Sequence, residues 1–276
     1  MSIPIIANPL CHQSLSLEDG IRLVLSVGFD HIELCRGPVA PCKTPQLRQQ
    51  LRGFVASLGS KIVGFNVPDQ DYFQALNSPD DFAPALEGLK GDIDKGSDLG
   101  VDYVLTFEGR VPAGASADAI NGPIFDSTCS LLQQANEYAA AKGIELVVEV
   151  HPFTLGIDVD WLCRLCDTIG DNFGVAYDPC HFGVGSPDSY LEAIGKLGSR
   201  IKCVHFSDSD KISSELHFPP GKGCLDLDGI LNELKGIDFR GSWMVDYWLY
   251  PLPEEAARSG LAFLREALKD FDHYSA

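Results

Sequence analysis

The chain has few basic residues, and this shortage excludes several classes of partner. Its 276 residues include 21 Lys and Arg against 39 Asp and Glu, which gives a formal net charge of −18. Nucleic acids and anionic membrane surfaces carry charge of the same sign, so a surface of this composition repels them. We therefore expect neither a nucleic acid nor a membrane as a partner.

Long hydrophobic runs are also missing. A membrane-spanning helix needs about 20 predominantly apolar residues in succession, and no such stretch occurs. The first residues lack the basic and apolar regions of a secretory signal peptide. Hydrophobic residues nevertheless make up 45% of the chain, a content typical of proteins that bury a core. These features predict a globular protein located in the cytoplasm.

Paired cysteine motifs are scarce, although the chain contains nine cysteines. The number is odd, the residues are scattered, and a chain of this length needs no disulfides to stabilise its core. Cys163 and Cys166 form a C-x-x-C motif, but no second pair or nearby histidine completes a zinc site. We interpret the nine cysteines as reduced thiols.

Eight short apolar segments, rich in β-branched residues, recur along the chain and predict strands. Most of them lack alternating polar positions, which is typical of parallel strands buried on both faces of a sheet. The segments are residues 4–8, 31–34, 61–65, 103–107, 145–150, 173–177, 201–206 and 242–247.

Signals for helix starts and stops lie between the expected strands. Capping side chains, several followed by proline, predict helix starts at Ser16, Thr44-Pro45, Ser78-Pro79, Ser186-Pro187 and Asp226. Glycines suited to a left-handed residue after a helix are Gly28, Gly59, Gly100, Gly143, Gly170 and Gly236.

These alternations of strand and helix predict a (β/α)₈ TIM barrel in a single domain that spans residues 1–276. A doubly wound open sheet is the alternative architecture. It is less favoured because no glycine-rich phosphate-binding sequence follows the first expected strand, where PIIANPLCHQS stands.

Polar residues at the carboxyl ends of the last four strands indicate a metal site. Glu149, Asp178, His205 and Asp246 each enter or leave an apolar strand, and a closed barrel brings these ends around one axis. Three carboxylates and one imidazole favour Mn²⁺ or Mg²⁺, with Co²⁺ or Zn²⁺ also compatible. Taken singly, each residue could instead cap a helix or pair with a Lys or Arg.

Four motifs resemble the xylose-isomerase-like TIM-barrel superfamily. They are E-x-H-P at 149–152, D-x-x-H at 178–181, HFSD at 205–208 and PPGKGCLDLDGI at 219–230. This superfamily holds sugar and sugar phosphate isomerases and epimerases, inosose and dehydroshikimate dehydratases, and AP endonucleases. The endonuclease branch is disfavoured, because the ends of expected strands two to four lack the extra histidines that its metals need and because the chain is acidic.

The resemblance implies roles for the residues that match these motifs. The four strand-end residues fall on metal positions, and Glu149 and Asp246 also fall on the acid–base pair of the epimerase-like members. His181 matches a substrate-contacting histidine. The basic residue expected before the glycine loop falls on His217 when counted back from that loop, and on Lys211 when counted forward from His205; we favour His217.

One further residue is a candidate for the site, and two residues depart from the family's pattern. Glu33, at the end of the second expected strand, is a candidate for substrate contact. Asp246 stands where the family usually has the longer Glu, which affects its reach as a base more than its use as a metal ligand. Lys222 stands where the family has an acid, and the sequence offers no account of it.

The predicted function is a divalent-metal-dependent isomerase or epimerase of a sugar or sugar phosphate, which removes an α-proton and passes through a metal-bound enediolate. The alternative is a metal-dependent dehydratase. The segment 11–34 and the sequence EVHPFTL resemble dehydroshikimate dehydratases, in which a histidine at the position of His151 is a catalytic candidate. Against this alternative, Ser207 stands where those enzymes tend to have Lys. A non-catalytic sugar-binding barrel is a third class. The expected partner is a small polyhydroxylated substrate, and the amphipathic segment 261–271 leaves the oligomeric state open.

Overall fold

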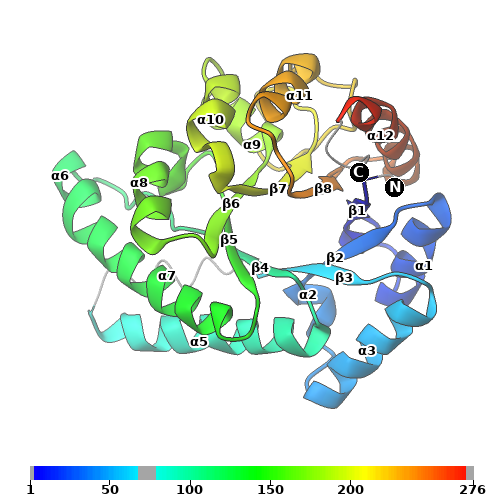
Figure 1. Cartoon of the computed structure of the whole chain (residues 1–276), viewed down its shortest axis with the longest axis horizontal. Coiled ribbons are helices and arrows are strands. Elements are labelled where there is room, and N and C mark those ends of the chain that lie inside the picture. Colours follow the sequence, from blue (N-terminus) through cyan, green and yellow to red (C-terminus); the bar gives the residue numbers. More distant parts are fainter. Residues whose placement is uncertain (1–2, 68–78, 272–276) are drawn as a thin grey trace.

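The computed structural model describes residues 3–67 and 79–271. Eight parallel strands close into a barrel in which each strand pairs with the next and β8 pairs with β1 (Figure 1). The predicted TIM barrel is confirmed, and the doubly wound alternative is wrong. The strands are β1 Ile5–Ala7, β2 His31–Cys35, β3 Ile62–Asn66, β4 Tyr103–Thr106, β5 Glu145–Glu149, β6 Phe173–Tyr177, β7 Ile201–Phe206 and β8 Ser242–Val245.

The strands are buried on both faces, as their apolar composition predicts. One set of side chains fills the inside of the barrel and the other packs against the surrounding helices. The inner set comprises Ile6, Val63, Tyr103, Leu105, Val147, Ala176, Cys203 and Met244. Alternation along β2 places Ile32 and Leu34 in the outer core, so Glu33 between them faces the barrel axis.

Helices surround the barrel in chain order (Figure 1). The α-helices are α1 Leu17–Val27, α2 Arg36–Val39, α3 Pro45–Ser57, α5 Pro79–Leu99, α6 Ala117–Ala119, α7 Phe125–Ala140, α8 Val159–Ile169, α9 Pro179–Gly185, α10 Tyr190–Leu197, α11 Leu227–Gly236 and α12 Pro253–Ala267. Short 3₁₀ turns occupy η1 Pro9–Cys11, η4 Leu155–Ile157, η5 Gly198–Arg200 and η6 Leu268–Asp270, and η3 Ile120–Ile124 is a π-helical turn.

Three of the predicted helix starts are confirmed by side-chain caps. Ser16, Thr44 and Asp226 each accept a hydrogen bond from a backbone N–H in the first turn of α1, α3 and α11. Ser78 lies outside the described residues. The predicted start at Ser186 is wrong, because Ser186 ends α9 and the next helix begins at Tyr190.

Most of the predicted helix stops are also confirmed. Five of the six glycines have a positive φ: Gly28, Gly59, Gly100, Gly143 and Gly170. Gly236 instead belongs to α11, and Asp238 takes the positive φ after it. The predicted end of this helix is therefore near the right position, but the residue with positive φ is Asp238 rather than Gly236.

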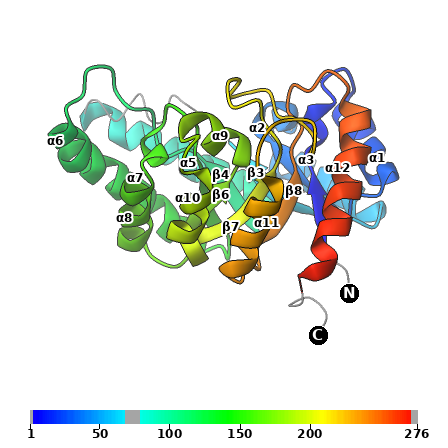
Figure 2. The ribbon, with the colours of Figure 1, turned by 90° about the horizontal axis from the view of Figure 1, so that it is seen from above.

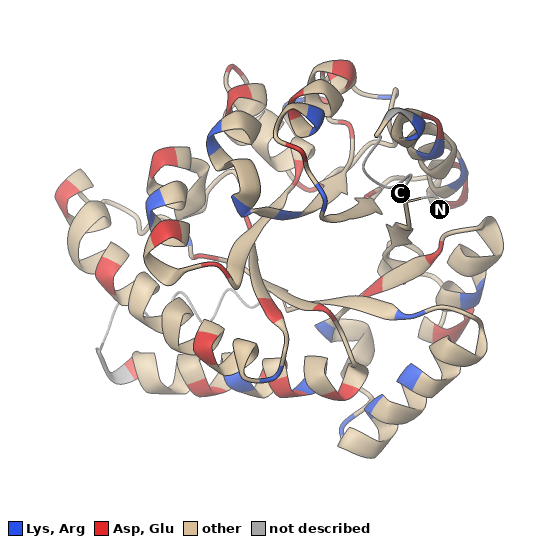
Figure 3. Cartoon of the chain, viewed as in Figure 1, with Lys and Arg blue, Asp and Glu red and all other residues tan. Residues whose placement is uncertain are grey.

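The carboxyl ends of the strands share one side of the barrel with the long connection between β7 and α11 (Figure 2). Acidic residues are distributed along the outer helices (Figure 3). All nine cysteines are free, and Cys163 and Cys166 lie on α8. In the part of the chain that the structure describes, no helix has the length and apolar character needed to cross a bilayer.

Candidate active site

A cavity of about 450 Å³ opens at the carboxyl ends of the strands. Residues at or just after the end of every strand line this cavity, as expected for an active site of this fold. One such residue from each strand end, in chain order, is Asn8, Glu33, Asn66, Phe107, Glu149, His181, His205 and Asp246.

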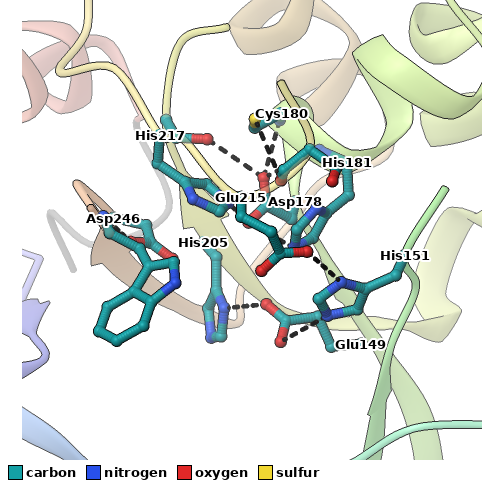
Figure 4. A network of polar contacts seen from close by, with 12 residues as sticks. Glu149, His151, Asp178, Cys180, His181, His205, Glu215, His217 and Asp246 are labelled. Carbon is teal, nitrogen blue, oxygen red and sulfur yellow. Dashed lines mark hydrogen bonds and ion pairs between the residues drawn. The ribbon is translucent and has the colours of Figure 1, made fainter. Parts of the chain in front are cut away.

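The cavity brings together most of the residues that the sequence predicts. Besides five of those just named, His151 and His217 line it (Figure 4). Asp178 is fully buried behind His217. Lys211 lies outside the lining, with its Nζ 4.7 Å from the ring centre of Tyr190. Lys222 is exposed and also stands outside the lining residues.

His205 lies between two buried carboxylates. Its Nδ1 is 2.5 Å from Oε1 of Glu149, and its Nε2 is 3.2 Å from Oε2 of Glu33. Burial would lower the pKa of His205, but the two carboxylates raise the pKa well above its usual value. Burial would likewise raise the pKa of Glu149, but the charge of His205 holds that pKa well below its usual range.

Asp178 forms a second ion pair and is also the N-cap of α9. Its Oδ1 accepts hydrogen bonds from the backbone N–H of Cys180 (2.7 Å) and the hydroxyl of Ser207 (3.1 Å). Its Oδ2 lies 3.0 Å from Nε2 of His217. Burial opposes ionisation, yet the charge of His217 lowers the pKa of Asp178 to about 2. His217 is buried too, but facing Asp246 and Asp178 raises its pKa to about 10.

Two stacked imidazoles, His151 and His181, form the third part of the site. Their ring centres are 3.8 Å apart. Burial would lower the pKa of His151, but hydrogen bonding to Glu149 and Glu215 raises it to about 9. Burial, together with repulsion by His151, lowers the pKa of His181 to about 3. The stack therefore pairs a charged ring with a neutral one at neutral pH.

Asp246 differs from the other carboxylates. Its Oδ1 accepts the backbone N–H of Trp248 at 2.8 Å, and it is 8% exposed. Burial raises its pKa, although the charge of His217 counteracts part of this effect. Glu149 and Asp246 thus have pKa values moved in opposite directions.

Glu149, Asp178 and His205 offer ligand atoms that all lie within 4.8 Å of one another. Two oxygens and one imidazole nitrogen are a donor set that divalent transition metals accept. Two overlapping groups involve His181: one with Glu149 and His151, the other with Asp178 and His217. Asp246, the fourth predicted ligand, belongs to none of these groups among the described residues.

Sequence reasoning missed several polar residues of the site. Tyr103 lies inside the barrel and donates a hydrogen bond to Glu33 at 2.7 Å. Its inward position could have been read from the alternation along its strand. Glu215, whose Oε1 is 3.4 Å from Nδ1 of His151, comes from an irregular connection without a periodic signal. Asn66 ends β3, lines the cavity, and has a buried Oδ1 without a hydrogen-bond partner.

A closed barrel of eight parallel strands with metal-capable side chains at the strand ends defines the class of TIM-barrel proteins, whose active sites lie at that end of the barrel. Within it, the chain belongs to the family described as xylose isomerase-like TIM barrel, which it matches over residues 21–267.

Curated relatives include inosose isomerases of two Bacillus species. The chain is 28% identical to the Bacillus licheniformis protein over 163 residues, which are 56% of each chain. It is also 28% identical to the Bacillus subtilis protein over 161 residues, 55% of each. The matched part of the chain thus spans little more than half the length of these relatives.

Solved structures share the fold over nearly the whole chain. The IolI protein with a bound zinc atom has a TM-score of 0.81 at 19% identity and covers 98% of this chain and 100% of its own. D-psicose 3-epimerase from Clostridium cellulolyticum H10, with D-tagatose, has a TM-score of 0.79 at 16% identity, covering 97% and 99%. A D-tagatose 3-epimerase-like protein reaches 0.79 at 22% identity, covering all of both chains.

Proposed function

We propose that the protein is a divalent-metal-dependent isomerase or epimerase of a small polyhydroxylated carbonyl compound, a sugar or sugar phosphate. The observation that carries this proposal is the convergence of Glu149, Asp178 and His205 beside a cavity that is also lined by Asp246 and two charged histidines. The inosose isomerase relatives and the epimerases of the same fold support it.

Glu149, Asp178 and His205 would hold the ion, with Asp246 as the predicted fourth ligand. We keep Mn²⁺ as the preferred metal, and the zinc atom of the IolI structure supports Zn²⁺ as the competing choice. When bound, such an ion would polarise a substrate carbonyl and acidify the adjacent C–H group.

Opposite pKa shifts suggest how the two carboxylates divide the proton transfers. Glu149, whose pKa is lowered, stays ionised and serves as the base that accepts the α-proton. Asp246, whose pKa is raised, carries a proton of its own more readily and donates that proton at the other face or at the neighbouring carbon, which leaves Asp246 as a carboxylate. Protonated His151 and His217 donate hydrogen bonds to substrate oxygens, and neutral His181 provides an acceptor or donor beside them.

The test is α-proton exchange in D₂O with Mn²⁺ or Zn²⁺ and a panel of ketohexoses and inososes. Glu149→Gln is expected to lower the exchange rate at least 1,000-fold, because the base is lost. Glu145→Gln, at the opposite end of the same strand beside Lys202, is the matched control and should keep the wild-type rate. Equal exchange by wild type and Glu149→Gln would reject the assignment of the base.

A metal-dependent dehydratase is the second candidate, and Arg110 favours it. Arg110 is the single Lys or Arg among the residues found to line the cavity within the described ranges. Its guanidinium lies 4.4 Å from the ring centre of Phe153 at the rim. A fixed cation in a cavity lined with acids suits a substrate that carries a carboxylate, and protonated His151 could protonate a departing hydroxyl.

Dehydroshikimate and a neutral inosose distinguish the two candidates. If the dehydratase proposal holds, Arg110→Met should raise KM for dehydroshikimate about 10-fold or more and leave kinetics with neutral compounds unchanged. Arg164→Met, a substitution on α8 away from the cavity, is the control. Conversion of a neutral inosose to an isomer of unchanged mass would favour the isomerase, whereas loss of water from either compound would favour the dehydratase. A barrel that binds no divalent ion and turns over neither compound would favour the non-catalytic class.

A further inference from the structure

We propose that Tyr103 and Glu33 are positioning residues of the metal centre, which act by fixing the orientation and the tautomer of His205. Tyr103 lies far from the strand-end motifs in sequence, and Glu33 is otherwise a candidate for substrate contact. The inference rests on the proposed function in one respect: it takes His205 as a metal ligand.

A continuous chain of hydrogen bonds links these residues. The hydroxyl of Tyr103 donates to Oε2 of Glu33 at 2.7 Å, and the same oxygen lies 3.2 Å from Nε2 of His205. The three side chains are almost fully buried. Water therefore does not compete for these contacts, and each contact restricts the next.

The two ring nitrogens of His205 face different partners. Nδ1 points to Glu149, a member of the metal-capable group, whereas Nε2 points to Glu33, which belongs to no such group among the described residues. A metal-binding imidazole usually donates its other N–H to a carboxylate, and this contact sets the tautomer and the orientation of the ring. Glu33 is the carboxylate that accepts this hydrogen bond, and Nε2–H of His205 is the donor.

Tyr103 fixes the carboxylate in turn. Since its O–H group occupies Oε2 from inside the barrel, Glu33 cannot rotate without losing a buried hydrogen bond. Oε1 of Glu33 remains buried without a partner, and Glu33 lines the cavity. One oxygen thus holds His205, and the other remains available to a substrate hydroxyl.

The close packing of Gly64 against Tyr103 supports this role of Tyr103 independently. It pairs with Tyr103 across β3 and β4, and a Cβ at this position would lie 2.5 Å from two ring carbons of Tyr103. Any larger residue would displace the ring. A glycine inside a buried strand weakens that strand, and close approach of a neighbouring group is a common reason for its presence. Here the glycine makes room for the tyrosine that holds Glu33.

Metal titration by calorimetry tests the inference without a substrate. Tyr103→Phe removes only the hydroxyl and is expected to weaken Zn²⁺ or Mn²⁺ binding about 10-fold; Glu33→Gln should weaken it 10- to 100-fold. Tyr177→Phe is the matched control, because Tyr177 is also fully buried and donates to a backbone carbonyl, that of Tyr190, at 2.7 Å. It should bind the metal as the wild type does.

The ¹⁵N spectrum of the His205 ring gives a second readout that a general loss of stability would not change. The zinc-loaded wild type should show Nε2–H, and Glu33→Gln should alter or broaden that signal. Wild-type metal affinity in Tyr103→Phe, or an equal loss in Tyr177→Phe, would overturn the inference alone. A wild-type protein that binds no divalent ion would contradict both the inference and the proposed metal function.

Discussion

At the scale of single residues, Glu108 shows how burial raises the pKa of a carboxyl group when one of its oxygens lacks a hydrogen-bond partner. It follows β4 and is fully buried. Its Oε1 accepts the N–H of Gly156 at 2.7 Å, whereas Oε2 has no hydrogen-bond partner. Burial raises its pKa from 4.5 to about 7. Glu108 thereby connects the end of β4 to the segment after β5 that carries His151.

This shift predicts a pH-dependent stability. Because the folded state retains the proton more strongly than the unfolded state, the free energy of unfolding falls as pH rises from 4.5 through about 7. The difference between these two pKa values corresponds to roughly 3 kcal/mol. Glu108→Gln should remove this contribution, as measured by urea unfolding at pH 5 and pH 8. If wild type and variant lost the same stability between these pH values, the shift would be absent.

Whether a site residue could be predicted from the sequence depends on whether it interrupts an apolar segment. Glu149, Asp178, His205 and Asp246 each interrupt an apolar run, so their unusual positions are visible in the sequence. Tyr103 interrupts nothing, because a tyrosine is common in a buried strand. Its function depends on a partner 70 residues earlier in the chain.

At the scale of elements, glycine positions separate backbone conformation from packing. Gly143 ends the helical segment before β5 with φ 71°, and Gly53 lies inside α3 with an ordinary helical conformation. A Cβ at either position would meet no atom within 4 Å. The two sites therefore differ in backbone geometry rather than in available space.

This pair of sites predicts opposite effects of the same substitution. Gly143→Ala should lower the free energy of unfolding by about 1 kcal/mol, because alanine is strained at positive φ. Gly53→Ala should raise it by roughly 0.5–1 kcal/mol, because alanine favours a helix. Denaturant titration of both variants measures the two changes. A loss in both would mean that factors other than φ dominate.

The conformation of the connection after β7 could not be predicted from the sequence. The buried carboxylate of Asp208 accepts backbone N–H groups of Ser209, Gly221, Gly223 and Leu225. These contacts fold the segment back and place His217, rather than Lys211, at the cavity. Residue spacing left both candidates open, because it does not determine how an irregular segment folds.

At the scale of the whole molecule, the candidate metal group joins three neighbouring strands of the barrel. Glu149, Asp178 and His205 lie at the ends of β5, β6 and β7. The carboxylates of Glu149 and Asp178 pair with the buried histidines His205 and His217, respectively. A bound divalent ion would therefore stabilise the folded barrel relative to the unfolded chain.

Thermal unfolding should show this linkage. At a metal concentration 100 times Kd the stabilisation is about 2.7 kcal/mol, so Tm should rise with Mn²⁺ or Zn²⁺ and fall on adding a chelator. Glu149→Gln should reduce the rise, whereas Glu145→Gln should keep it. A Tm independent of both ions would argue against a metal centre.

The sequence by itself determined the barrel and the chemical character of its site. Unbroken apolar runs, helix caps and terminal glycines are local signals, and polar residues at successive strand ends become neighbours in any barrel that closes in chain order. Tertiary structure decided the partners of His205, the insertion of Tyr103 beside Gly64 and the choice between His217 and Lys211. Those contacts join residues as many as 172 positions apart, and their geometry depends on barrel register and loop folding.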